Sequence, residues 1–391
     1  MRTFPCVVTF LLFPLLFLAP AITGAEEGAR TLLGEPWRYE RPPGLRYGAP
    51  IDTGTYQYGN PTAAEQAHLE RINRARLDPQ AEADRLLGGN LNEGITDHSD
   101  FISTASKQPL AFNARLYQAA RLHSQDMIAQ DYFAHTSKDG RSPWDRIADA
   151  GYAPLQYGAE NIAGTYAPVP IDEAGTILAM HDQFVVDSGV TGRGHRINIF
   201  NDNLKEIGIG AATGSFVYNG IAYNYTWMLT CDFGTLASGN PFVLGVVYND
   251  KNRDGQYTAG EGLGVVDISI LRPSDAGTAA TTTASAGGYG IPLPPGTYEV
   301  TATLSDGRSV KKTAVVSDRN VKIDFRSSDF PIPGDVDGNG RVDLADAVMA
   351  LRIVAGVSAT PSPPPTASLA GNGKIGLAEA IYALQKAAGA R

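Results

Sequence analysis

Apolar residues recur at helical spacing in three stretches of the first half of the chain. The first stretch begins near residue 61 and ends at Asp78-Pro79, the second follows Asn113, and the third covers about residues 171–187. The second stretch includes a histidine in its apolar stripe, which consists of Leu116, Ala120, His123 and Met127. These patterns predict three amphipathic helices.

The pattern changes to short strands after His195. Strand-like runs lie at residues 206–210, 216–218 and 223–231. Helices followed by neighbouring strands are typical of an α+β domain, in which helices cover an antiparallel sheet. We therefore predict one such domain over residues 61–238.

Residues 239–327 show a strict two-residue alternation. Apolar residues occupy every second position around Ile268, around Val300 and around Ile323, and Gly, Pro and Ser turns separate these runs. Short alternating strands of this kind predict an all-β sandwich domain.

Residues 328–391 contain an internal duplication. The segment GDVDGNGRVDLADAVMALRIVAG is echoed by SLAGNGKIGLAEAIYALQKAAG, and a proline-rich tract at 361–365 separates the two. Each copy combines a Gly-Asn-Gly turn, an acidic residue seven positions after the asparagine, and an amphipathic helix. The repeat predicts a small all-α domain.

The N-terminus has the pattern of a secretory signal peptide. Arg2 precedes an apolar run from Cys6 to Ala21, and small-residue cleavage patterns end at Ala21 and Ala25. The run is about 16 residues long, which is shorter than the roughly 20 residues of a spanning helix. We predict that residues 1–25 are removed and that the protein is secreted or held at the cell surface, without a stable membrane span.

Residues 26–60 are rich in Gly, Pro and Tyr and show no sustained period. We interpret them as a linker, or as a strap that lies over the next domain.

The net charge and the cysteine content argue against a nucleic-acid partner and against stabilisation by disulfides. The formal net charge is −9, which argues against a nucleic-acid partner. Loss of Cys6 with the signal peptide leaves Cys231 as the single cysteine, so no disulfide within the chain is expected. The acidic residues cluster at 250–261 and 335–346.

Four segments of the first domain resemble the CAP superfamily (cysteine-rich secretory, antigen 5 and pathogenesis-related proteins) in its bacterial, SCP-like form. They are LERINRARLDP (69–79), PLAFNARLYQAARLHSQDM (109–127), YFAHTSKDGRSPWDRIADAGY (132–152) with GAENIAG (158–164), and GHRINIF (194–200) with KEIGIGAA (205–212) and TCDFG (230–234). The resemblance implies an α-β-α sandwich with one open cleft. It places His135, Glu160 and His195 in that cleft, and a fourth acidic position near Asp187.

Two imidazoles and a carboxylate can support more than one chemistry. They suit a zinc ion with water in the remaining position, and such a water can become hydroxide near neutral pH. Alternatively, His and Glu can act directly as general base and acid. A purely structural role for these side chains is a further alternative. We interpret His123 as a hydrogen-bonded histidine of the core or of the cleft floor, because it lies in its own helix's apolar stripe.

The sandwich domain begins with a calcium-type loop. Oxygen-bearing residues occupy positions 1, 3, 5, 7, 9 and 12 of a twelve-residue loop, and Gly255 occupies position 6, where a sharp turn is needed. The six residues are Asp250, Asn252, Asp254, Gln256, Thr258 and Glu261. The domain resembles the calcium-binding B-type sandwich repeats of bacterial surface adhesins.

The C-terminal repeat carries the same register. Its first copy supplies Asp335, Asp337, Asn339, Arg341, Asp343 and Asp346, with Gly340 at position 6. In the second copy the carboxylates at positions 1, 3 and 9 are missing. The pair resembles dockerin repeats, which implies a cohesin-like or cell-surface partner, and we expect calcium in the first loop. The alternative is a helix pair that only packs against its own sandwich.

Two functions remain open from the sequence. We favour a secreted binding protein whose His/Glu cleft holds a metal, a small ligand, a lipid or a glycan, and whose calcium-binding modules serve as spacer and dock. The alternative is an extracellular zinc-dependent or acid–base hydrolase of peptide, lipid or glycan. Catalytic signatures such as HExxH or GxSxG are absent from the sequence, and the sequence does not decide whether the protein is an enzyme.

Overall fold

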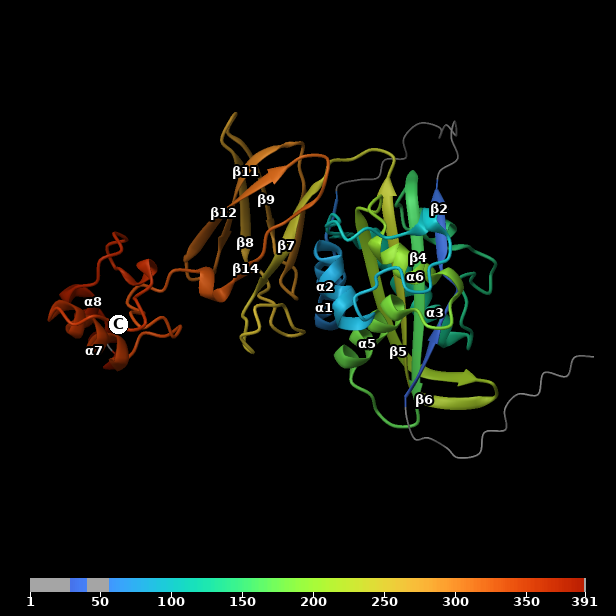
Figure 1. Cartoon of the computed structure of the whole chain (residues 1–391), viewed down its shortest axis with the longest axis horizontal. Coiled ribbons are helices and arrows are strands. Elements are labelled where there is room, and N and C mark those ends of the chain that lie inside the picture. Colours follow the sequence, from blue (N-terminus) through green and yellow to red (C-terminus); the bar gives the residue numbers. More distant parts are fainter. Residues whose placement is uncertain (1–28, 41–55, 390–391) are drawn as a thin grey trace, which may run out of the picture.

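A computed structural model of the protein describes residues 29–40 and 56–389, so the predicted signal peptide lies outside the described residues. Three bodies follow one another along the long axis of the molecule (Figure 1). The first contains helices around a sheet, the second contains strands, and the third is a pair of short helices. Within the described residues no helix is long and apolar enough to cross a membrane.

A six-stranded sheet forms the centre of the first domain. Its order is β1-β4-β6-β5-β3, with β2 also paired to β4, and every pairing except β3 with β5 is antiparallel. The strands are β1 (Arg30–Leu33), β2 (Trp37–Glu40), β3 (Ala111–Phe112), β4 (Leu155–Ala167), β5 (Glu206–Tyr218) and β6 (Ile221–Leu236).

Helices cover both faces of this sheet, which gives the expected α-β-α layers (Figure 1). One side has α1 (Ala63–Leu77), α2 (Pro79–Leu86), α5 (Glu173–Val186) and α6 (Gly194–Phe200), and the other has α3 (Ala114–Ala129) and α4 (Pro143–Asp149). Short 3₁₀ turns lie at His98–Asp100 and Thr191–Arg193. The helix boundaries follow local sequence signals. Thr62 and Glu65 cap the start of α1 reciprocally, and the side chain of Asp78 caps α2, whose first residue is Pro79.

The layers pack closely because two glycines of β5 lie under α3. A Cβ on Gly208 would lie 2.0 Å from the backbone carbon of Leu116, and a Cβ on Gly210 would lie 2.2 Å from the backbone nitrogen of Arg121. Only hydrogen fits there, so helix backbone and strand backbone come into direct contact.

Residues 30–40, which we name the N-terminal strap, pair with the edge of β4 that faces away from β6. The prediction of a linker without regular structure over 26–60 therefore missed β1 and β2. The alternative prediction, a strap that lies over the next domain, describes residues 30–40. The strap was missed because edge strands of four residues are too short to show a clear period.

Residues 242–326 form two four-stranded sheets around one core, as the alternation predicted. Ile268 and Ile270 are buried, whereas the alternating residues Asp267 and Ser269 are exposed. The strands are β7 (Phe242–Tyr248), β8 (Asp267–Arg272), β9 (Gly277–Thr282), β10 (Gly288–Pro292), β11 (Gly296–Thr303), β12 (Ser309–Val316), β13 (Val321–Lys322) and β14 (Phe325–Arg326), followed by a 3₁₀ turn at Ser327–Asp329.

The third body consists of α7 (Leu344–Val354) and α8 (Leu377–Ala387), with a 3₁₀ turn at Pro365–Ala367 between them. Its core is small and consists of Val336, Ala350, Ala367 and Ala380.

An ion pair, hydrogen bonds and apolar contacts join the first two domains. Lys322 forms an ion pair with Glu70 at 2.8 Å, and both side chains are 9% exposed. The amide of Asn320 donates to the backbone oxygens of Pro109 (2.8 Å) and Lys205 (2.7 Å). Tyr248 and Tyr257 of the sandwich pack with Ala67 of α1. These directed contacts hold the sandwich in one orientation against the first domain.

Candidate functional site

The strand β4 carries Glu160 at its middle, with the carboxylate fully buried. Nδ1 of His135 lies 2.5 Å from one carboxylate oxygen, and the guanidinium of Arg146 donates to the other at 2.6 Å. Burial alone would raise the pKa of Glu160, but the hydrogen bond from His135 and the charge of Arg146 outweigh it and lower this pKa to about 2. The carboxylate is therefore ionised at neutral pH.

Arg146 connects this pair to the loop that carries His135. It projects from α4, whose start is capped by Ser142 and Asp145, and it also donates to the backbone oxygen of His135 at 2.7 Å and to Oγ of Ser137 at 3.1 Å. One buried cation thus fixes both the imidazole and its loop. Sequence analysis did not single out Arg146, which lies within the 132–152 motif.

A second imidazole–carboxylate pair lies at the junction of α5 and α6. Asp187 ends α5 in the left-handed conformation (φ 53°), and its carboxylate lies 2.7 Å from Nδ1 of His195 and 2.9 Å from the His195 backbone nitrogen. Both side chains are fully buried. The fourth cleft position expected near Asp187 therefore lies against His195.

Both histidines keep their second nitrogen without a partner. Nε2 of His135 and Nε2 of His195 are buried, and neither forms a hydrogen bond with the described residues. Because a carboxylate fixes Nδ1 as the protonated nitrogen, each Nε2 presents a lone pair. The two carboxylates thus orient the imidazoles, and Glu160 uses its two oxygens for His135 and Arg146.

The N-terminal strap covers this region. The indole of Trp37 stacks on the His135 ring at 5.6 Å with an angle of 7° between the planes. A Cβ on Gly34 would lie 3.1 Å from Nε2 of His135, and a Cβ on Gly194 would lie 2.1 Å from Cγ of Pro36. The amide of Asn198 donates to the backbone oxygen of Trp37 at 3.3 Å. Residues 34–37 therefore lie over the cleft that was expected to be open.

The remaining buried histidines have other hydrogen-bond partners or ring contacts, and His123 lies near the first pair. His123 has Nε2 3.0 Å from the backbone oxygen of Ala134, and burial lowers its pKa to about 4. On the other side of the sheet His181 lies 2.9 Å from Glu82, and the ring of His68 packs edge-on against that of His181. Arg85 binds both oxygens of Glu82, so this cluster is already charge-balanced.

Asp232 is a buried acid that sequence analysis missed. It lies opposite Glu160 in the β4–β6 register. Neither of its carboxyl oxygens accepts a hydrogen bond from the described residues, and the carboxyl lies within hydrogen-bonding reach of Glu160. Burial, followed by the negative charge of Glu160, raises its pKa well above the usual value. The only signal in the sequence is an acidic residue inside the apolar run of the TCDFG motif.

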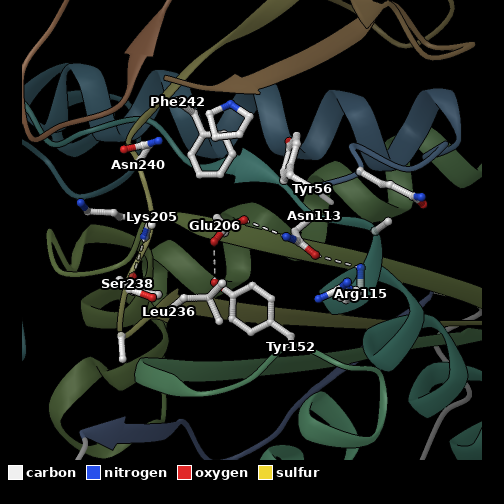
Figure 2. Close-up of a pocket in the computed structure, with 16 residues that line it drawn as sticks. Tyr56, Asn113, Arg115, Tyr152, Lys205, Glu206, Leu236, Ser238, Asn240 and Phe242 are labelled. Atoms are coloured by element: carbon white, nitrogen blue, oxygen red, sulfur yellow. Dashed lines mark hydrogen bonds between the residues drawn. The ribbon is translucent and has the colours of Figure 1, made fainter. Parts of the chain in front are cut away.

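A cavity of about 600 Å³ lies at the junction of the first two domains (Figure 2). Its lining includes Tyr56, Arg115, Lys205 and Phe242. Glu206 lies at its floor, where it accepts 2.7 Å hydrogen bonds from the hydroxyl of Tyr152 and the amide of Asn113. Burial raises the pKa of Glu206. Both oxygens are used within the protein, so this carboxyl serves as an anchor between β5 and its neighbours.

The loop at 250–261 folds around its last acidic residue. The carboxylate of Glu261 accepts from the backbone nitrogens of Lys251 (2.8 Å) and Thr258 (2.9 Å), and Gly255 (φ 76°) donates to Asp250 at 3.0 Å. The second oxygen of Asp250 is buried and has no hydrogen-bond partner in the part of the chain that the structure describes. The side chain of Gln256 accepts from Arg74 of α1, which leaves its backbone oxygen as the group expected at position 7.

The loop at 335–346 has the same construction. Asp346 accepts from the backbone nitrogens of Val336 (2.7 Å) and Asp343 (2.8 Å), and Asp335 accepts from Gly340 at 2.9 Å. The carboxylates of Asp335, Asp337 and Asp346 come within 4.8 Å of one another. Burial and the other two carboxylates raise the pKa of Asp335. In the second copy Glu379 accepts from Leu369 and Gly376, but the partner carboxylates are absent.

Comparisons with known proteins identify the first two domains. Residues 69–233 match the family model described as CAP, the cysteine-rich secretory protein family, and residues 243–333 match the SdrD B-like domain. The chain therefore contains a CAP domain followed by an SdrD B-like domain, as the motifs predicted. Both domain types are typical of extracellular or cell-surface proteins.

Individual relatives match over short regions. The "Uncharacterized protein YkwD" of Bacillus subtilis (strain 168) is 35% identical over 104 residues, which is 26% of this chain and 35% of YkwD. The "Uncharacterized membrane protein YlbC" of the same organism is 29% identical over 97 residues, which is 25% of this chain and 24% of YlbC. The chain thus spans about a third of the length of YkwD and about a quarter of the length of YlbC.

A crystal structure of an extracellular protein containing a SCP domain from Bacillus anthracis str. Ames is 23% identical in sequence to this chain. The alignment covers 33% of this chain and 34% of that chain, with a TM-score of 0.23.

The buried position of Asp232 generates a prediction on pH dependence. Between the unfolded-state pKa near 3.8 and the raised folded-state pKa, the folded chain holds one proton more than the unfolded chain. The contribution of Asp232 to the free energy of unfolding is therefore fully present at low pH and is lost as the pH rises towards the folded-state pKa. Asp232→Asn removes this loss, so we expect a variant whose Tm exceeds that of the wild type by about 2–4 °C at pH 7.5.

The Tm difference should shrink towards pH 4, and differential scanning calorimetry at several pH values measures it. Asp84→Asn, at an exposed position of α2, controls for the loss of one charge. A Tm gain independent of pH, or one equal to that of the control, would contradict the prediction.

Proposed function

We propose that the protein is a secreted CAP-domain binding protein whose cleft takes a transition metal, such as zinc, on Nε2 of His135 and of His195. The observation that carries the proposal is the pair of buried imidazoles, each anchored at Nδ1 by a carboxylate and each with a free Nε2. This donor set fits zinc, because ligating histidines commonly donate their other ring N–H to a carboxylate.

The residues of the chain hold and orient the donors. Glu160 and Asp187 fix the imidazole tautomers, and Arg146 neutralises the Glu160 carboxylate. A bound zinc ion would supply Lewis acidity and an activated water. The hydrolase alternative requires this metal or a substrate-activating base, so metal binding is the first property to measure.

The metal proposal predicts one zinc ion per chain in isothermal titration of the full-length protein. His135→Ala combined with His195→Ala should weaken zinc binding at least tenfold, because both donors are removed. His98→Ala, which removes an exposed imidazole from the 3₁₀ turn at His98–Asp100, should leave the affinity unchanged. Equal zinc binding by the double variant and the wild type would refute the cleft site.

We also propose that calcium stabilises the second and third bodies through the loops at 250–261 and 335–346. In both loops the buried position-12 carboxylate accepts hydrogen bonds from the loop backbone. In the second loop the carboxylates at positions 1, 3 and 12 also come within 4.8 Å of one another. With Cys231 buried and unpaired, bound ions can supply the cross-links that disulfides provide elsewhere.

Calcium should raise the Tm of the wild type, and each loop should respond separately in calorimetry. We expect Glu261→Gln to abolish the calcium response of the sandwich and Asp346→Asn to abolish that of the helix pair. Glu379→Gln, the matched change in the second copy, should leave the calcium response intact. A wild-type Tm that does not change with calcium would exclude both sites.

We further propose that the C-terminal helix pair docks on a cell-surface partner of the cohesin-like type. The predicted apolar stripe of α7 does not pack on the sandwich. Leu344, Val348, Leu351 and Val354 are 44–58% exposed, and Leu377, Ile381 and Leu384 of α8 are 43–56% exposed. Two related stripes on one small body leave an apolar surface that favours docking over packing within the chain.

Docking is tested by the fraction of the full-length protein that stays with the cells after export. Val348→Asp combined with Ile381→Asp should move most of the protein into the medium, because both stripes then carry a charge. Ser358→Asp, in the exposed loop after α7, is the matched control. Unchanged retention of the double variant would contradict docking through this surface.

A further inference from the structure

We propose that the edge of β4 beside His135 and His195 is a peptide-binding groove, and that the N-terminal strap occupies it as a displaceable ligand. The partner class that fits is an extended peptide that adds a strand to the sheet. This inference goes beyond metal binding and does not depend on it.

The main chain of the strap shows how such a peptide binds. β1 pairs antiparallel with Ala163–Tyr166 of β4, and β2 pairs antiparallel with Tyr157–Glu160. Between the two strands, the backbone nitrogen of Gly34 donates to the oxygen of Ile162 at 3.1 Å. These bonds come from backbone groups alone, so they are equally available to another extended segment.

Side chains of the strap enter separate subsites on the two faces of the sheet. Leu32 packs with Met127 and Ile162 on the α3 side, whereas Leu33 packs against the main core on the other side. Successive residues of an extended chain point to opposite faces, so this aliphatic pair fixes the register.

A second set of subsites lies at the histidines. Trp37 stacks between His135 and Trp144, and Tyr39 also packs against Trp144. Pro36 lies against Gly194, where a side chain on the helix would occupy its place. The groove therefore selects an aliphatic pair followed by a small residue, a spacer, a proline and an aromatic residue, the pattern of Leu32–Trp37.

Three features make the strap displaceable. None of the side chains described within it is fully buried, and Arg30, Thr31, Glu35 and Arg38 are exposed. Its pairing is interrupted at residues 34–36, directly over the histidines. It also lies outside residues 69–233, so the matched CAP domain by itself leaves the β4 edge open. An open edge accepts a strand from any source.

The test uses a fluorescein-labelled peptide with the sequence of residues 29–40, ARTLLGEPWRYE, in buffer containing EDTA, so that metal binding cannot affect the result. Fluorescence anisotropy compares the full-length mature chain with a chain that begins at Arg41. We expect the shortened chain to bind the peptide at least tenfold more tightly than the full-length chain. A scrambled peptide should bind at least tenfold more weakly.

Gly194→Ala in the shortened chain supplies a matched groove variant. Gly194 has helical dihedral angles (φ −67°, ψ −29°), so alanine fits the backbone, but its methyl group fills the space that Pro36 takes. We expect unchanged circular dichroism and Tm, and at least tenfold weaker binding of the peptide.

Several outcomes would overturn the proposal. They are a folded shortened chain that does not bind the peptide, and equal binding of the scrambled peptide. If the shortened chain does not fold, Leu33→Ala with Trp37→Ala in the full-length chain replaces it. Failure of this folded variant to bind the peptide would show that the strap is an integral part of the sheet.

Discussion

The buried ion pair between Glu160 and Arg146 is the interaction on which the cleft depends. A carboxylate in the middle of a sheet must be paired, because an isolated buried charge is costly. Arg146 and His135 share its two oxygens. This requirement brings α4 and the loop of His135 onto β4, fixes the imidazole at Nδ1 and leaves Nε2 free. The chemistry available to the cleft thus follows from the way one buried charge is satisfied.

The edge of β4 imposes a second constraint. A CAP domain limited to the family-matched residues would present unpaired backbone groups along this strand, next to both imidazoles. The N-terminal strap pairs with that edge, and its residues 34–37 lie against His135 and against Gly194, the residue before His195. The same segment therefore completes the edge of the sheet and lies over the candidate site. Edge protection and ligand binding use the same hydrogen-bonding groups, so they exclude each other.

The SdrD B-like domain and the C-terminal helix pair are held by noncovalent contacts and not by disulfides. The SdrD B-like domain is fixed to the CAP domain by the buried pair Lys322–Glu70 and by the amide of Asn320. Its acidic loop touches the same surface, since Arg74 of α1 donates to Gln256. The C-terminal helix pair has a core of small residues and exposes most of its large apolar side chains. The sandwich is thus joined to the CAP domain by directed contacts, and the exposed apolar surface lies on the C-terminal helix pair.

The sequence by itself determined the first two modules and many of their elements. Helical and two-residue periods predicted α1, α3, α5 and the sandwich strands, because those elements each bury one continuous face. The CAP-like motifs also predicted that His135, Glu160 and His195 share one cleft. Only the tertiary structure decided what these residues do. It showed that Glu160 and Asp187 orient the imidazoles, that Arg146 and Asp232 share the buried site, and that the strap covers it. Such pairings join residues far apart in the chain, and a local pattern contains no information about which buried charge will meet which partner.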